Sequence, residues 1–260
     1  MRTLRLATGA TISYWGHLKL QATSLTTLSL EYGATSNGST TSQLLSISEF
    51  LPPYLQDRIR RDDRFQSRLG IRVSPAPNSA SFNVSVRGGG FNTPTASLGW
   101  HSHPSISFRA SFRDPRPRGA GAKLCTDLIT LTPREYVVDL TLGLSTRAMR
   151  DLVVTMLNIK DLYLMGSAVS DVFLQSDSPS RTKLLPSLRH LRLGYFNPQD
   201  YDDWNPLIAY LTYRKSGGKA ISLRLLGGGP ISLWVQAESE NLVEELHLGH
   251  ETTHDMRSGL

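Results

Sequence analysis

Residues 137–248 repeat one short pattern five times: VVDLTL from Val137, IKDLYL from Ile159, LRHLRL from Leu188, AISLRL from Ala220 and VEELHL from Val243. The pattern is an apolar or small residue, two variable residues, and then Leu-x-Leu. The first leucine of each core stands at position 140, 162, 191, 223 or 246, so the gaps are 22, 29, 32 and 23 residues. A Leu-x-x-Leu-x-Leu core that returns at intervals of about 20–29 residues is typical of leucine-rich-repeat solenoids.

Each repeat is expected to contain a strand and a covering helix. Alternate side chains of a strand share a face, so both leucines of Leu-x-Leu point to one side and the residue between them to the other. One strand and one helix cannot bury these leucines, whereas neighbouring repeats on both sides can. The sequence therefore predicts an α/β fold: an irregular leucine-rich-repeat-like solenoid with a parallel row of strands and covering helices. The alternative is an ordinary α/β sheet with five unrelated amphipathic strands.

Five segments are predicted along the 260 residues. Residues 1–33 contain MRTLRL, WGHLKL and LTTLSL, and are expected to be the N-terminal strands of a truncated repeat series. Residues 34–69 are predicted as a linker with short helices, because they begin with the low-complexity stretch GATSNGSTTS. Strand-like alternation at 71–73, 82–86 and 106–112, separated by loops rich in Gly and Pro, predicts a β- and loop-rich insertion at 70–123. The leucine-rich-repeat region follows at 124–249, and a tail at 250–260.

Helices are predicted between the repeats. The stretch STRAMRDLVVTML at 145–157 has apolar residues at helical spacing behind a serine cap. A second helix is expected to begin at Asp202 or Asp203 and to end at Gly217 or Gly218, because glycine is the preferred residue after a helix C-terminus. A short third helix is predicted over 237–244.

Composition bounds the compartment and the class of partner. The single cysteine, Cys125, excludes an internal disulfide framework and any zinc site built on several thiolates. No apolar run approaches the roughly 20 residues that span a bilayer, and the N-terminus lacks an apolar signal core. We therefore expect a cytoplasmic or nuclear protein that does not bind membranes. The net charge of +6 is spread along the chain and does not predict nucleic-acid binding.

Several stretches together resemble one known family. LLPSLRHLRL, DDWNPLIAYLTYRKSGGKAISLRL and NLVEELHL resemble the C-terminal leucine-rich region of F-box-type proteins of mushroom-forming fungi. FRASFRDPRP and LCTDLITLTPREYVVDLTL resemble the middle of the same proteins, so the resemblance covers roughly residues 70–249. It implies a substrate receptor, in which an N-terminal F-box binds the adaptor of an SCF-type ubiquitin ligase and the repeats hold the protein to be ubiquitinated.

The chain departs from this family in two respects. No helical F-box opens it, and the F-box-like fragment LPPYLQDRI lies at 51–59, in mid-chain. A ligase adaptor is therefore expected as a partner only if an F-box is supplied elsewhere. Regular repeats also carry Asn three residues after the second leucine, whereas these positions hold Ser145, Ser167, Phe196, Gly228 and Glu251. We expect an irregular coil for this reason.

One motif suggests catalysis. His250, Glu251 and His254 match H-E-x-x-H, which on a helix places two zinc-binding imidazoles and a general base on one face. Only six residues follow His254, and two β-branched threonines within the motif weaken a helix. A frayed tail is favoured over a zinc-dependent hydrolase, which stays open as an alternative. A gene fragment without independent function is a third possibility, and no cofactor is predicted.

The predicted binding site follows from the strand geometry. The residues between the paired leucines should face outward in one line, and Tyr and Arg are enriched at interface hot spots. We therefore predict a non-catalytic surface that binds a protein partner, formed by Thr141, Tyr163, Arg192, Arg224 and His247. A parallel line is expected to hold Asp139, Asp161, His190, Ser222 and Glu245. The alternative is an ordinary solvated sheet face.

Overall fold

The computed structural model describes part of the chain in two compact units, Met1–Thr141 and Leu142–Leu260. The described residues are 3–8, 27–33, 56–57, 59–61, 65, 69–75, 80–88, 105–112, 126–127, 129–130, 132–143, 151, 153–166, 168–173, 184–194, 201–226 and 233–249. Across these residues, no helix is long and apolar enough to cross a membrane. The HETTH motif at 250–254, the WGHLKL pattern at 15–20 and most of the predicted linker lie outside them.

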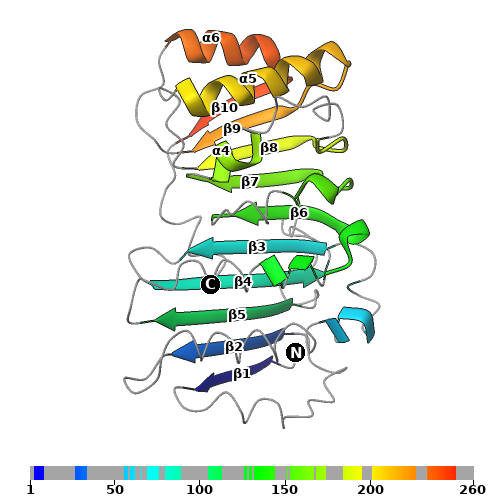
Figure 1. Ribbon diagram of the computed structural model, residues 1–260, viewed down its shortest axis with the longest axis vertical. Coiled ribbons are helices and arrows are strands. Elements are labelled where there is room, and N and C mark those ends of the chain that lie inside the picture. The colour runs from blue at the N-terminus through cyan, green and yellow to red at the C-terminus, as the bar shows by residue number, and fades with distance from the viewer. Residues whose placement is uncertain are drawn as a thin grey trace. The chain divides into compact units, whose positions relative to one another are not determined.

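Unit 1 is built on strands that pair in the order β1-β2-β5-β4-β3 (Figure 1). Their bounds are β1 Thr3–Thr8, β2 Thr27–Gly33, β3 Leu69–Pro75, β4 Ala80–Gly88 and β5 Ser105–Phe112. The β1/β2 and β2/β5 pairs are parallel, whereas β3/β4 and β4/β5 are antiparallel. The strand patterns predicted at 71–73, 82–86 and 106–112 are confirmed. The unit closes with the 3-10 turn η3 (Arg134–Tyr136) and with strand β6 (Val137–Leu142), whose last residue belongs to unit 2.

Unit 2 carries four parallel strands in chain order, β7 (Asp161–Met165), β8 (His190–Gly194), β9 (Ser222–Leu226) and β10 (Glu245–Gly249). Between them run the helices α4 (Ala168–Phe173), α5 (Tyr201–Ser216) and α6 (Leu233–Leu242) (Figure 1). The chain is thus an α/β protein whose strands are mostly parallel. The prediction of a parallel row is confirmed for these four repeats, and the place of Val137–Leu142 beside them stays a prediction.

The paired leucines of β7, β8 and β9 form the core of unit 2. Each of these six side chains is at most 5% exposed: Leu162, Leu164, Leu191, Leu193, Leu223 and Leu225. Helix α5 supplies a buried stripe to this core through Trp204, Leu207 and Leu211, which recur at helical spacing. The last strand is different, because Leu246 is half-buried and Leu248 is 45% exposed.

Helix α5 ends where glycine was predicted to end it. Gly218 has φ +65°, a left-handed conformation that costs glycine little. The Lys219 N–H donates to the Arg214 carbonyl at 2.9 Å and the Gly218 N–H to the Lys215 carbonyl at 2.9 Å, which is the Schellman pattern of bonds. The other helix bounds differ from expectation, since α5 begins at Tyr201 and α6 at Leu233. In the predicted 145–157 helix, residues 151 and 153–155 are helical.

Candidate functional site

The face of the β7–β10 sheet that carries no paired leucines, here called the open face, displays two lines of polar side chains. The strand register aligns Tyr163 with Arg192, Arg192 with Arg224, and Arg224 with His247. It also aligns Asp161, His190, Ser222 and Glu245 in a second line. Neighbouring strands lie about 4.8 Å apart, so the four residues from Tyr163 to His247 span about 14 Å. Four of the five predicted site residues therefore lie together, and all four are half-buried or exposed.

The prediction that Thr141, the fifth site residue, faces solvent is wrong. Its side chain is only 7% exposed, and Asp139 two residues earlier is only 4% exposed. The prediction assumed that alternate residues of every repeat strand face solvent. In β6 residues of both alternating sets are buried, as in strands that are covered on two faces. Thr141 therefore cannot contribute to an exposed binding surface.

Two histidines engage both carboxylates of the open face. His190 Nδ1 lies 2.8 Å from Asp161 Oδ1 on the neighbouring strand. His247 Nε2 lies 3.0 Å from Glu245 Oε2 on its own strand. Arg192 and Arg224 sit side by side between these pairs, and neither guanidinium has a hydrogen-bond or ion-pair partner among the described residues. Like charges directly opposite each other on adjacent strands destabilise a sheet, so the arginine pair costs stability in the isolated chain.

A glycine on the open face makes room for one long side chain of the central line. A methyl group added to Gly194 of β8 would meet the Tyr163 ring at 2.9 Å from Cε2 and 3.0 Å from Cζ, and Oη still closer. The Tyr163 ring therefore leans across from β7 and covers the Gly194 backbone. Gly249 of β10 is different, because a Cβ there would lie 4.0 Å from Arg224 Nη2, an ordinary contact distance, and 3.3 Å from Leu226 Cδ2. The close approach of Tyr163 therefore explains the final glycine of HLRLG.

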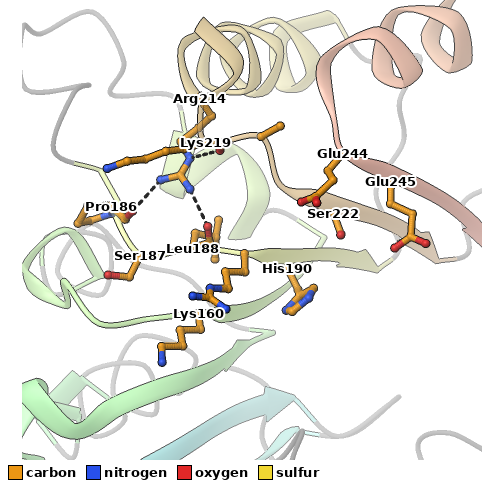
Figure 2. A pocket seen from close by; sticks show the side chains of 12 residues that line it. Lys160, Pro186, Ser187, Leu188, His190, Arg214, Lys219, Ser222, Glu244 and Glu245 are labelled. Carbon is orange, nitrogen blue, oxygen red and sulfur yellow. Dashed lines mark hydrogen bonds between the residues drawn. The ribbon is translucent and has the colours of Figure 1, made fainter. Parts of the chain in front are cut away.

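A cleft of about 840 Å³ adjoins the open face at the N-terminal ends of β8, β9 and β10 (Figure 2). His190, Ser222 and Glu245 belong to both surfaces. Figure 2 shows the acidic side chains Glu244 and Glu245 on one side of the cleft and Lys160 on the other. The cleft therefore extends the polar surface beyond the open face and carries charges of both signs.

Arg214 on α5 borders this cleft and was not singled out from the sequence. Its side chain is 6% exposed, and its guanidinium donates to four backbone carbonyls. The acceptors are Leu185 O at 3.2 Å, Pro186 O at 2.9 Å, Leu188 O at 2.6 Å and Lys219 O at 3.0 Å. This arginine fastens the turn before β8 to the end of α5 (Figure 2). One feature of the sequence could have drawn attention to Arg214: it lies ten residues after Trp204, on the apolar stripe of the helix.

The line Asp161, His190, Ser222 has the order of a catalytic triad, and His190 bonds the carboxylate through Nδ1 as a triad histidine does. A nucleophile must also lie within hydrogen-bond reach of its base. In the described part of the chain, no hydrogen bond joins Ser222 to His190. The N–H groups of both residues are taken by strand pairing, with Lys160 O and Arg189 O as acceptors, so neither can stabilise an oxyanion. The described hydrogen bonds therefore join Asp161 to His190 and leave Ser222 outside this pair.

A metal site finds no support in the described residues, which contain no cluster of three or more His, Cys, Asp or Glu side chains that could hold an ion. The motif residues His250, Glu251 and His254 are outside them. Comparisons of the chain with protein-family models, with curated proteins and with solved structures found no match.

Proposed function

We propose that the protein is a non-catalytic recognition module, which binds a protein partner through the open face of β7–β10. The observation that carries this proposal is the line Tyr163, Arg192, Arg224 and His247, aligned on four consecutive strands, of which β7, β8 and β9 carry buried paired leucines on the opposite face. Tyr and Arg are over-represented at interface hot spots, because both combine large contact area with hydrogen bonding. The buried leucines fix β7, β8 and β9, so Tyr163, Arg192 and Arg224 are presented on a rigid support.

The finer reading is a leucine-rich-repeat-like solenoid that acts as the substrate receptor of an SCF-type ubiquitin ligase. Its support is the recurrent Leu-x-Leu core, the parallel order of β7 to β10 and the resemblance of residues 70–249 to fungal F-box-type proteins. The ligase adaptor would join through an F-box supplied elsewhere. Recovery of the ligase adaptor together with the protein from cell extract tests this part of the proposal separately.

The recognition function is tested by affinity capture with the full chain and quantitative mass spectrometry. The variant Tyr163→Ala/Arg192→Ala removes two neighbouring side chains of the open face. A matched control, Tyr213→Ala/Lys215→Ala, removes the same aromatic residue and one cation from exposed positions of α5. We expect a partner that wild type and control retain and that the open-face variant loses while its thermal unfolding is unchanged. Equal capture by all three proteins contradicts the proposal.

A zinc-dependent hydrolase that uses His250, Glu251 and His254 is the second candidate, supported by the H-E-x-x-H sequence. Metal analysis of the purified protein distinguishes it from the recognition module. Stoichiometric zinc that is lost in His254→Ala favours the hydrolase, and its absence in wild type rejects that candidate.

A further inference from the structure

We infer that the partner segment seated on the open face is acidic and extended, with two carboxylates that pair with Arg192 and Arg224. This inference rests on the proposed recognition function and specifies the chemistry of the partner. It starts from an imbalance of charge in the central line. Arg192 and Arg224 are direct neighbours in the β8/β9 register, and neither has a hydrogen-bond or ion-pair partner in the part of the chain that the structure describes.

The acids nearest to these arginines on the same face are already engaged. Asp161 is held by His190 at 2.8 Å, and Glu245 by His247 at 3.0 Å. The histidines thus keep the carboxylates at the two ends of the surface, and the positive charge in its centre is left without a counter-charge among the described residues. A carboxylate is the natural complement, because a guanidinium can donate two parallel hydrogen bonds to it.

The spacing of the arginines indicates how the carboxylates are arranged. Adjacent strands are about 4.8 Å apart, whereas residues i and i+2 of an extended peptide lie about 6.6–7 Å apart on one side. Two flexible arginine side chains can bridge this difference, so acidic residues separated by one position fit a peptide that runs across the strands. The four-residue line spans about 14 Å, which an extended segment of four to five residues covers. Tyr163, whose ring lies against Gly194, offers an aromatic surface at one end of this path.

Selection from a phage-displayed library of random 12-residue peptides tests the inference with the full chain as bait. Wild type is expected to enrich peptides with two Asp or Glu residues within four positions. Arg192→Gln/Arg224→Gln should bind a selected peptide at least tenfold more weakly, because a hydrogen bond to a charged group contributes about a factor of ten or more in Kd. The matched control, Arg60→Gln/Arg61→Gln, removes two exposed arginines from unit 1 and should bind as wild type does.

A charge reversal adds a readout that a merely structural role would not change. Arg192→Glu/Arg224→Glu is expected to select Lys- and Arg-rich peptides in place of acidic ones, with a midpoint of thermal unfolding within about 2 °C of wild type. Selected peptides without acidic enrichment that still require Tyr163 would overturn the acidic partner while supporting recognition by the open face. Equal binding by wild type and the Gln variant overturns the inference. Failure of capture by every variant in the extract experiment would instead count against the proposed function.

Discussion

The guanidinium of Arg214 is predicted to stabilise unit 2, and the substitution Arg214→Met measures its contribution. Methionine keeps an unbranched stem but removes every donor. The carbonyls of Leu185 and Leu188 then lose a buried hydrogen bond each, while those of Pro186 and Lys219 are only partly buried and can bond to water. The buried Leu188 carbonyl is left without a donor, which costs about 1–3 kcal/mol, whereas the Leu185 carbonyl keeps its bond from the Leu188 N–H and loses only one ordinary hydrogen bond, about 0.5–1.5 kcal/mol. Burial of the apolar methionine returns about 1 kcal/mol, which leaves an expected loss of about 0.5–3.5 kcal/mol.

Two further variants make this prediction specific. Arg214→Lys keeps the charge, but a single ammonium cannot reproduce the planar fork, so we expect an intermediate loss of about 1–2 kcal/mol. Lys219→Met removes an exposed cation at the same helix end and should stay within about 0.5 kcal/mol of wild type. A purely electrostatic role of Arg214 at the helix terminus would make the Lys variant equal to wild type.

Guanidinium unfolding followed by circular dichroism gives the free energies, and native-state hydrogen exchange locates the effect. Leu185 has φ +47°, an unfavourable conformation for a branched side chain, and its carbonyl also accepts the Leu188 N–H at 3.1 Å. We therefore expect amides of residues 184–194 to exchange faster in Arg214→Met than in wild type. A loss below 0.5 kcal/mol, the usual value at surface positions, would refute the role assigned to this arginine.

Three other substitutions have defined outcomes. Leu191→Ala removes a fully buried leucine and should lower the free energy of unfolding by about 2–5 kcal/mol in denaturant titrations, whereas a change below about 0.5 kcal/mol would place it outside the core. Tyr210→Phe removes a buried hydroxyl that has no hydrogen-bond partner in the described structure, so it should stabilise the protein by about 0.5–1.5 kcal/mol at neutral pH. Burial raises the pKa of Tyr210, an effect only partly offset by the positive charge of Arg214. Above about pH 10 the unfolded chain therefore releases this proton before the folded one, and wild type should lose up to about 1.4 kcal/mol per pH unit relative to Tyr210→Phe. A constant difference across that range would contradict the burial of the phenol. Gly194→Ala should cost about 1–3 kcal/mol by overpacking against Tyr163, and should cost at least 0.5 kcal/mol less in a Tyr163→Ala background; additive losses would show that the two residues do not touch.

The leucine periodicity was sufficient to predict the strands of unit 2 and their parallel order. The leucines recur because each repeat must place its pair in the same apolar layer. Their spacing in the sequence therefore identifies the strands. Arg214 could not be assigned in the same way. Its place on the apolar stripe of α5 distinguishes it from Lys215, but its four acceptors come from residues 185–188 and from Lys219, and only the folded chain brings them together.

Thr141 shows a second limit of the pattern. VVDLTL and IKDLYL have the same alternation, yet Thr141 is buried and Tyr163 is half-buried at the equivalent position. Alternation assigns a residue to one face of a strand, but it does not say whether that face is covered. Coverage depends on segments distant in sequence, and the Leu-x-Leu core carries no information about them.

The two faces of the sheet differ in whether their side chains find partners among the described residues. The leucine layer is satisfied within the chain, since six of its side chains are at most 5% exposed. On the opposite side, Asp161 pairs with His190 and Glu245 with His247. Tyr163 packs against the backbone of Gly194. Arg192 and Arg224 are the exception, because their neighbours in the register bring like charge together and no described carboxylate relieves it. A fold that needed these positions only for solubility would be more stable with an alternating pair of signs there. The arginine pair is therefore better explained by a carboxylate that arrives from outside the chain, and the acidic-peptide selection is the experiment that decides between this explanation and an ordinary solvated face.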